Sequence, residues 1–497
     1  MNKRFLSVLL VLVLGAGLLS ACSGGADNTA SPTPSSATPT ASPADLHGVV
    51  ALTVGDVEVS VIEYNIYYFN TMYNLSQSYQ NASLDPSGED FDAAVSDQTD
   101  EIVQSTVFLA AEARKSGMTL SEDSQIYLDQ TMASYDYYAS SAGVSADDFI
   151  SQTMGAGATR ADYEKYLGDG LLASQWLKAK ADACAYSRSD YTAYYYQHRD
   201  DVDTVDFRFY MIQPENLGED ATDAEKTAAR DTARAKAEAF SQKAVSEDAF
   251  IAAAVEFADE ADKETFQNKP DTTLVWHTRI SKLGDQKGYF FWIDGEQRVW
   301  LADPVRLMGD RTVAEWNGGQ MYIVFCFLGR QRPDYHAANV RHILFTFKGD
   351  DDTNTQTPTD TQKADAQQQA QDAYDQWKAG ELTEASFATL AGQLSEDTGS
   401  NTNGGLYENV RMGELERPFE EWCFEVGRRP GDSGLVETVF GFHVMYYVSQ
   451  NDQPAWMDIA RDNLTTEVVN AYLDGLKASY PLVKNDSGMS LTKKQTS

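Results

Sequence analysis

The spacing of apolar and polar positions changes several times along the chain, and each change predicts a different kind of element. Short alternating runs within residues 48–60, on either side of Gly55 and Asp56, predict two strands joined by a turn. Helical spacing then predominates up to residue 200. The later helical patterns cover residues 90–116, 121–139, 145–152, 160–185 and 191–198. Residues 46–200 are therefore predicted to form a mainly helical region.

A second kind of pattern, in the order strand, helix, helix, loop and strand, occupies residues 203–333 and begins again within residues 336–450. Two pairs of segments align between these stretches without gaps. They are Phe250 to Glu260 with Phe387 to Asp397, and Gly309 to Val324 with Gly431 to Tyr446. Self-similarity of this length predicts a duplicated domain.

The two copies differ at polar positions of their apolar strands. In the second copy, the strand V-R-H-I-L-F-T-F carries His342 and the strand G-F-H-V-M-Y-Y-V carries His443. The alignment places Phe209 opposite His342 and Met321 opposite His443. We therefore expect the first copy to keep the fold and to lack the polar site.

One more helical pattern follows the second copy, within residues 451–485. Its apolar positions are Ile459, Leu464, Val468, Tyr472 and Leu476. A single amphipathic helix cannot bury its own apolar face. We expect this helix to fold back onto the helical region 46–200.

The N-terminus has the pattern of an export signal. Basic residues precede an apolar run, Phe5–Leu19, which is too short to cross a bilayer comfortably, and L-S-A-C then ends at Cys22. This pattern predicts a signal peptide at residues 1–21. Residues 22–45 are mostly Ser, Thr, Pro, Ala and Gly with little to bury, which predicts a disordered tether.

Charge and cysteine content narrow the function classes. The chain has 75 acidic and 39 basic residues and a net charge of −36, which argues against binding to nucleic acid or to anionic lipid head groups. Beyond Cys22, the residues Cys184, Cys326 and Cys423 allow at most one disulfide, and none has metal-ligand spacing. We expect no metal and no cofactor, and we leave a disulfide open.

Several motifs of the second copy occur in a fixed order: V-R-H-I-L, the turn S-E-D ending at Asp397, then G-G-L, P-F-E-E-W-C-F and T-V-F-G-F-H-V-M. In this order, residues 336–450 closely resemble the parvulin (PpiC, rotamase) family of peptidyl-prolyl cis–trans isomerases. The L-S-A-C motif resembles the lipobox of bacterial lipoproteins, which implies lipidation of Cys22. The whole arrangement resembles extracytoplasmic foldases of the PrsA and SurA type, and its tandem copies are more similar to SurA.

The resemblance implies an α+β protein. A helical chaperone module would comprise the N-terminal region 46–200 and the C-terminal helix within 451–485. Two parvulin-like domains, each a small antiparallel sheet flanked by helices, would follow as a degenerate copy at 203–333 and an isomerase copy at 336–450.

By position, the resemblance also implies a site. The catalytic group would be His342, Asp397, His443 and Thr438, and the cup for the proline ring would be Leu406, Leu415 and Phe419. Rotation about an X–Pro bond crosses a barrier of about 18–20 kcal/mol without forming a bond to the enzyme, so it requires neither a nucleophile nor a metal. The site must instead bind the twisted amide better than the planar one.

The loop after the first strand of the second copy bears on substrate choice. Relatives directed at phosphorylated peptides have a basic cluster there, whereas this chain has Asp350, Asp351 and Asp352. Three carboxylates would repel a phosphate group. We therefore do not expect specificity for phosphoserine-proline.

Two functions from different classes follow. The first is a membrane-anchored extracytoplasmic peptidyl-prolyl cis–trans isomerase and chaperone that assists the folding of secreted proteins. Its partners would be unfolded or prolyl-containing secreted polypeptides and the membrane, through the N-terminal lipid, and a homodimer stays open. The alternative is a non-catalytic holdase that uses the parvulin-like domains only to bind peptides. A solute-binding lipoprotein fits less well, because it needs two α/β lobes joined by crossovers.

Overall fold

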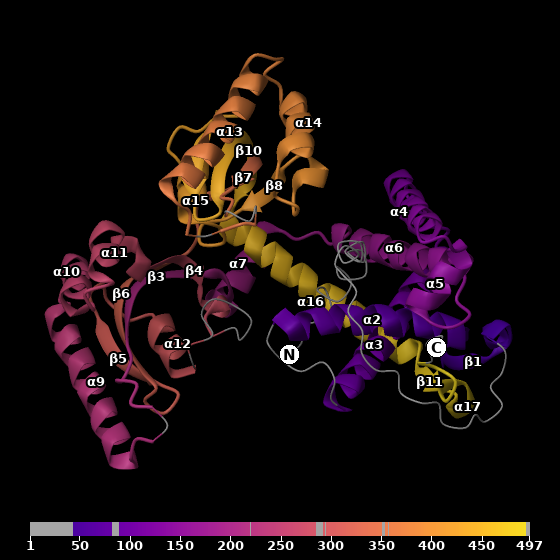
Figure 1. The fold of residues 1–497 in the computed structure, drawn as a ribbon, viewed down its shortest axis with the longest axis horizontal. Helices are drawn as coiled ribbons and strands as arrows, with labels where there is room; N and C mark the ends of the chain where they lie inside the picture. The colour runs from indigo at the N-terminus through magenta and orange to yellow at the C-terminus, as the bar shows by residue number, and fades with distance from the viewer. Residues whose placement is uncertain are drawn as a thin grey trace. The chain divides into compact units, whose positions relative to one another are not determined.

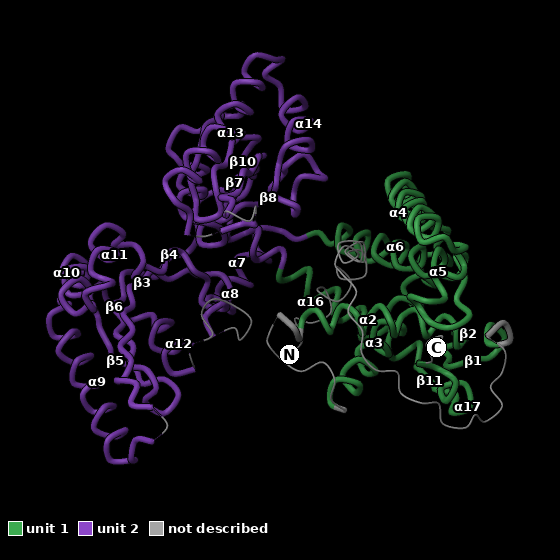
Figure 2. Tube along the Cα trace, viewed as in Figure 1, with its two compact units in different colours: residues 1–185, 463–497 green, residues 186–462 purple. Residues whose placement is uncertain are grey.

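The computed structural model describes residues 43–81, 89–218, 220–284, 292–293, 295–349, 353–355 and 357–493. The expected signal peptide, Cys22, the tether up to residue 42 and the acidic loop residues 350–352 lie outside them. The chain divides into two compact units, Met1–Ala185 with Asn463–Ser497 and Tyr186–Asp462 (Figure 2). Within the described residues, none of the helices combines the length and the apolar character that a membrane crossing requires.

The first unit is mainly helical, as the apolar spacing predicts. Its helices are α2 (Val61–Asn81), α3 (Glu89–Lys115), α4 (Glu122–Ser141), α5 (Ala146–Met154), α6 (Arg160–Asp182), the C-terminal part of α16 (Ala455–Ser479) and α17 (Asp486–Met489), with the short 3₁₀-helix η2 (Pro43–Gly48). The side chains of Ser121, Ser145 and Thr159 accept backbone N–H groups at the starts of α4, α5 and α6, which explains where these helices begin.

The C-terminal helix packs on the N-terminal helices, which confirms that expectation. Val469 and Leu473 of α16 are buried in the same core as Tyr64 and Leu109 of α2 and α3. The chain then adds strand β11 to a small antiparallel sheet of order β11-β1-β2. Its strands are β1 (Val50–Val54), β2 (Val57–Ser60) and β11 (Leu482–Lys484).

The second unit begins with two short helices, α7 (Arg188–Gln197) and α8 (Arg199–Val202), followed by two sheet-containing domains (Figure 1). The first domain has the strand order β4-β3-β6-β5. Its elements are β3 (Thr204–Ile212), α9 (Asp223–Lys243), α10 (Glu247–Phe257), α11 (Lys263–Asn268), η3 (Pro270–Thr273), β4 (Leu274–Arg279), η4 (Ile280–Lys282), α12 (Gly295–Ala302), β5 (Arg311–Trp316) and β6 (Met321–Gln331).

The second domain has the equivalent strand order, β8-β7-β10-β9. Its elements are β7 (His336–Thr346), α13 (Asp360–Lys378), α14 (Glu384–Leu394), η5 (Asn401–Asn403), β8 (Leu406–Val410), α15 (Arg417–Cys423), β9 (Ser433–Thr438) and β10 (Gly441–Pro454). Both sheets are antiparallel throughout. The predicted α+β class, with two small antiparallel sheets flanked by helices, is confirmed.

Helices α13 and α14 cover one face of the second sheet (Figure 1), where they pack on Ile343 and Val444. Successive side chains of a strand point to opposite faces, so His342 and His443 lie on the other face. Because side chains alternate along each strand, both histidines lie on the sheet face opposite to α13 and α14. On that face they lie beside a separate, smaller apolar cluster that includes Phe419.

The two copies also share local detail in the edge strand. His277 in β4 and Asn409 in β8 both have positive φ, at 48° and 57°. The backbone N–H of His277 donates to Asp206 at 2.6 Å, and that of Asn409 donates to Asn339 at 2.8 Å. The same irregularity thus recurs in both domains, which supports a duplication.

This shared detail fixes the alignment of the first strands. Phe209 lies three residues after Asp206, and His342 lies three residues after Asn339. Phe209 is therefore the structural counterpart of His342, as the sequence alignment predicts.

The counterpart of His443 differs from the predicted one. Met211 pairs with Ile323, and its equivalent Leu344 pairs with His443, so the counterpart is Ile323 and not Met321. The gap-free alignment is wrong here by two residues, because the β5–β6 hairpin has a four-residue loop and the β9–β10 hairpin has a two-residue turn. Since Ile323 is also apolar, the first copy still lacks both histidines.

Candidate functional site

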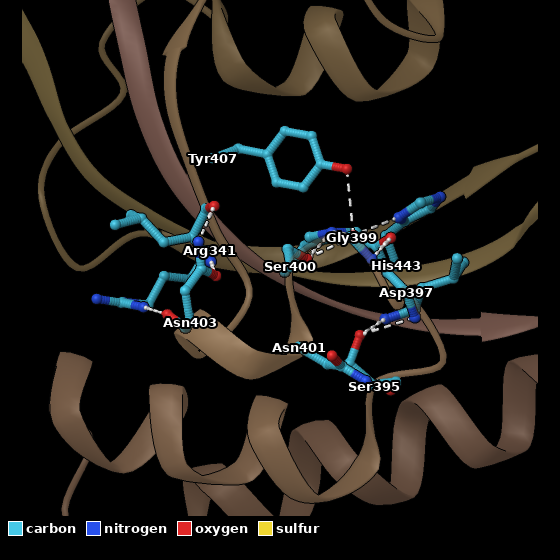
Figure 3. Close-up of polar contacts among 12 residues, drawn as sticks. Arg341, Ser395, Asp397, Gly399, Ser400, Asn401, Asn403, Tyr407 and His443 are labelled. Atoms are coloured by element: carbon cyan, nitrogen blue, oxygen red, sulfur yellow. Dashed lines mark hydrogen bonds and ion pairs between the residues drawn. The ribbon is translucent and has the colours of Figure 1, made fainter. Parts of the chain in front are cut away.

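Hydrogen bonds connect the four residues that the sequence singles out as a catalytic group. His342 Nε2 lies 2.8 Å from Asp397 Oδ2, and His342 Nδ1 lies 3.0 Å from His443 Nδ1. His443 Nε2 lies 2.8 Å from Thr438 Oγ1. The four side chains come from β7, the turn after α14, β10 and β9, and the fold brings them together as one chain of contacts. Figure 3 shows Asp397 and His443 within this group.

The partners of each atom define where the protons lie in this chain. Asp397 can only accept, so His342 Nε2 donates to it and His342 Nδ1 is left to accept from His443 Nδ1–H. His443 Nε2 then accepts the Thr438 hydroxyl proton, and Thr438 Oγ1 accepts the N–H of Phe440 at 3.2 Å. One proton on each imidazole satisfies every ring nitrogen.

Burial and hydrogen bonding set the charges of the site. His443 is only 6% exposed, and burial, reinforced by the neighbouring His342, lowers its pKa to about 3. Hydrogen bonds from His342 and Ser400 hold the pKa of Asp397 well below its usual range, although burial opposes them. At neutral pH the site therefore combines a neutral His443 with an ionised Asp397.

Two further residues hold Asp397 in place, and the sequence analysis missed both. The Ser400 hydroxyl donates to Asp397 Oδ2 and lies 3.1 Å from His342 Nε2. The Tyr407 hydroxyl also donates to Asp397 Oδ2, at 3.2 Å (Figure 3). Both lie close to Asp397 in the sequence, within the S-E-D-T-G-S and G-G-L-Y segments, so a local signal existed.

The S-E-D turn positions Asp397 by bonding to β7. Ser395 Oγ accepts the N–H of Leu344 at 3.1 Å, and Glu396 N–H donates to the Leu344 carbonyl at 2.9 Å. Glu396 Oε2 also accepts the N–H of Thr346 at 2.7 Å. The turn thus extends the sheet locally and brings Asp397 to His342.

A close approach of two backbones explains the glycine at position 405. Gly405 has φ +71°, and a Cβ there would lie 2.1 Å from the carbonyl oxygen of His342. The Gly405 carbonyl accepts the N–H of His342 at 2.9 Å. Only glycine allows this contact, which fixes the strand that carries the histidine.

Aromatic rings form an apolar wall beside the polar chain. The Phe419 ring lies 5.5 Å, centroid to centroid, from both His342 and His443 and nearly perpendicular to each. The Tyr407 ring lies 4.9 Å from His342. These residues and Leu415 line a cavity of about 770 Å³ that also reaches Asp397 and Thr438.

One residue of the expected proline cup does not belong to this wall. Leu406 pairs with Arg341, so it shares the sheet face of Arg341 and not that of His342. Among the described residues, Tyr407 lines the cavity in its place. The reason is strand parity: a shift of one residue in β8 moves a side chain to the opposite face.

Glu420 is a further buried group that the sequence analysis missed. It is fully buried and accepts the backbone N–H groups of Gly413, Glu414 and Leu415 at 2.8, 2.8 and 2.6 Å. Burial raises its pKa to about 7, although these three N–H groups lower it. Glu420 holds the loop that carries Leu415, the expected cup residue that lines the cavity.

Residues 342–449 match the family model described as the PPIC-type PPIASE domain, Rotamase. The chain therefore contains a rotamase domain of the PpiC, or parvulin, type. The match begins at His342 and includes every polar residue of the chain of contacts described above.

Known proteins resemble this chain over limited stretches. The chain is 33% identical over 67 residues to Foldase protein PrsA 1 of Listeria innocua serovar 6a, and 31% identical over 67 residues to Foldase protein PrsA 1 of Listeria monocytogenes serotype 4b. Each match covers 14% of this chain and 23% of the relative. The chain thus matches less than a quarter of the length of these curated relatives.

Solved structures show weaker similarity. The peptidylprolyl isomerase PrsA from Bacillus anthracis is 17% identical with a TM-score of 0.20, covering 29% of this chain and 60% of that one. PrsA from Bacillus subtilis is 14% identical with a TM-score of 0.18, covering 70% and 93%. A structure of SurA-like chaperones from Campylobacter jejuni is 21% identical with a TM-score of 0.18, covering 28% and 51%.

Proposed function

We propose that this protein is a peptidyl-prolyl cis–trans isomerase and chaperone for secreted polypeptides. The observation that carries the proposal is the buried His342–His443 pair, held between Asp397 and Thr438 and facing Phe419 in an open cavity. The rotamase domain at 342–449 supports the same function. We also propose the domain roles expected from the sequence: a chaperone module at 46–200 and 451–485, a degenerate copy at 203–333 and an isomerase domain at 336–450.

In the proposed reaction, the proline ring packs against Phe419, with Leu415 and Tyr407 beside it. Rotation of the amide removes its resonance and makes the group less polar, so apolar surroundings favour the twisted state over the planar one. No group of the enzyme has to form a bond to the substrate.

Asp397 acts electrostatically in this proposal. Its carboxylate is engaged by His342, Ser400 and Tyr407, which leaves it poorly suited to attack a carbonyl carbon. It orients the two imidazoles and places a negative charge near the substrate amide, where it disfavours the planar, polarised form.

The experiment is an NMR exchange measurement on an Ala-Pro peptide, without a coupled protease. The full-length protein should accelerate exchange, and Asp397→Asn should reduce this acceleration by about tenfold or more, as expected for loss of a preorganised charge. Glu260→Gln is a matched control, because Glu260 aligns with Asp397 in the first copy and its side chain is 90% exposed. It should leave the rate unchanged.

A second candidate is a holdase in which the histidines are structural. It is favoured by one observation: every ring nitrogen of the pair already has a partner inside the protein. Both candidates predict suppression of aggregation of an unfolded client. If the wild-type protein suppresses aggregation but does not accelerate prolyl exchange above the rate in buffer, the protein is a holdase and not an isomerase.

The proposed location is the outer face of the cytoplasmic membrane, through a lipid on Cys22. This part rests on the L-S-A-C motif and the tether composition. Labelling with a radioactive fatty acid should mark the wild type, and Cys22→Ala should abolish the label and release the protein from membranes. A label that persists in Cys22→Ala would refute the assignment.

A further inference from the structure

The cavity beside the histidines has a second wall, and the first copy provides it. Besides the residues of the isomerase domain, Phe209, Leu274, Val275 and Trp276 line the same space. Phe209 is the counterpart of His342, so the corresponding faces of the two copies open onto one cavity. In the first copy this face is apolar, since the Phe209 ring packs 4.9 Å from that of Trp292.

The two copies meet through close backbone packing at one edge of this cavity. Gly413 has φ +84°, and a Cβ at this position would lie 2.3 Å from the carbonyl oxygen of His277. The backbone of the loop at Gly413 therefore packs directly against the backbone of β4 at His277. Arg279 and Glu414 form an ion pair of 3.0 Å beside this contact.

A second set of contacts connects the proline cup to the first copy. Arg417, two residues before Phe419, forms an ion pair of 2.7 Å with Asp271. Its guanidinium carbon also lies 5.3 Å from the ring centroid of Trp276, a cation–π distance. Arg417 thus holds Trp276 next to the cup.

Buried Glu420 makes these contacts part of the site itself. It binds the N–H groups of Gly413, Glu414 and Leu415. The same short loop therefore contacts the first copy through its first two residues and lines the cup through its third. The loop cannot shift away from the first copy without displacing Leu415.

We infer that the histidine-free copy forms the second wall of its neighbour's prolyl-peptide site, and that Trp276 contacts the substrate side chain next to the proline. This inference rests on the proposed isomerase function. It assigns the first copy a role in substrate selection in place of a reaction of its own.

The chemistry of the wall defines the preferred substrate. Trp276 and Leu274 offer apolar area for a large apolar side chain. Among the described residues, five acidic residues and one arginine line the cavity. The acidic residues are Asp271, Asp397, Glu414, Glu416 and Glu420, and the arginine is Arg417. Glu414 and Asp271 are paired with arginines and Glu420 has a raised pKa, so Asp397 and Glu416 are the carboxylates that repel an acidic side chain beside the proline. The site therefore favours Phe-Pro over Ala-Pro and disfavours Glu-Pro.

The test compares Phe-Pro, Ala-Pro and Glu-Pro peptides with full-length wild type, Trp276→Ala, Trp276→Phe and Val299→Ala. Prolyl exchange is measured by NMR and binding by calorimetry. Val299 is 71% exposed on α12 of the same copy, so Val299→Ala is the control for a change in this domain. Trp276→Ala should lower kcat/KM for Phe-Pro by about tenfold, mainly through KM, because it removes apolar contact area.

In the same variant, Ala-Pro should change less than about twofold, since its small side chain makes little contact with the indole. Trp276→Phe should restore most of the Phe-Pro preference, and Val299→Ala should match the wild type. Equal losses for all three peptides, or no loss for Phe-Pro, would overturn the inference. If the wild type binds the peptides without accelerating exchange, the proposed isomerase function is wrong. The role of Trp276 is then tested by binding alone: it is supported if Trp276→Ala abolishes the preference for Phe-Pro and refuted if the preference remains.

Discussion

One hydrogen bond links the Nδ1 atoms of His342 and His443, which lie 3.0 Å apart in rings inclined by 23°. This bond is the only step in the polar chain of four residues that involves two imidazoles, and it joins the Asp397 side of the site to the Thr438 side. An N–H can donate in one direction only, so the two rings must adopt opposite tautomers. The protonation of one ring therefore fixes the tautomer of the other, and the two histidines are coupled.

The tautomers are the first prediction. Because Asp397 accepts from His342 Nε2, His342 should carry its proton on Nε2, and His443 should carry its proton on Nδ1. Nitrogen-15 NMR of histidine-labelled protein at pH 7 distinguishes the two forms by the shifts of the ring nitrogens. Observation of the same tautomer in both rings would contradict the chain of hydrogen bonds.

The second prediction concerns stability against acid. The pKa of His443 is lowered from 6.5 to about 3 in the fold, so the unfolded chain binds the extra proton over that range and the folded one does not. Stability contributed by this group is present above pH 6.5 and is lost as the pH falls toward 3. Its loss should be on the order of 2–4 kcal/mol, measured by urea unfolding.

His443→Gln provides the comparison, because glutamine does not titrate. The difference in unfolding free energy between wild type and variant should shrink as the pH falls from 7 to 4. A difference that stays constant over this range would mean that His443 titrates normally in the fold.

Much of the fold was predictable from local spacing, because each helix and strand repeats its own period of apolar residues. The α6 pattern ends near residue 185 in the sequence and at Asp182 in the structure. The pairing of strands was less accessible. Met321 and Ile323 lie on the same strand face, so apolar spacing could not distinguish them, and the length of a hairpin loop decided the alignment.

The site was predictable where residue type carried the signal. Two histidines on apolar strands are unusual, whereas Leu406 and Tyr407 both suit a strand, and only the pairing of Leu406 with Arg341 reveals which one faces the cavity. Glu420 resembles a solvated helix residue in sequence. Its burial depends on the loop folding over it, which no short pattern records.

Glu420 gives the third prediction. Burial raises its pKa from 4.5 to about 7, so between these values the folded protein binds more protons than the unfolded chain. Its contribution to stability is present below pH 4.5 and is lost as the pH rises to 7. This slope is opposite in sign to that of His443.

Glu420→Gln removes this titration. The unfolding free energy of the wild type should therefore fall relative to that of Glu420→Gln as the pH rises from 4.5 to 7. Both proteins should be measured in urea at matched ionic strength. If the wild type instead gains stability relative to Glu420→Gln over this range, the three backbone N–H groups outweigh burial and Glu420 is ionised throughout.

The fourth prediction separates steric contact from backbone strain at Gly405. A methyl group there would lie 2.1 Å from the His342 carbonyl oxygen, while Gly427 has φ +94° and open space around it. Gly427→Ala should cost about 1 kcal/mol from the left-handed backbone alone. Gly405→Ala should cost about 3 kcal/mol or more, because β7 and the 405 loop must also separate.

Displacement of β7 moves His342, so Gly405→Ala should lose the proposed prolyl isomerase activity along with stability, measured at a temperature where the variant is still folded. Gly427→Ala should retain full activity, because its backbone strain lies away from the histidine pair. Equal destabilisation of the two variants would show that the loop relaxes without moving the strand. In that case the close approach at Gly405 would not be what holds His342 against Asp397.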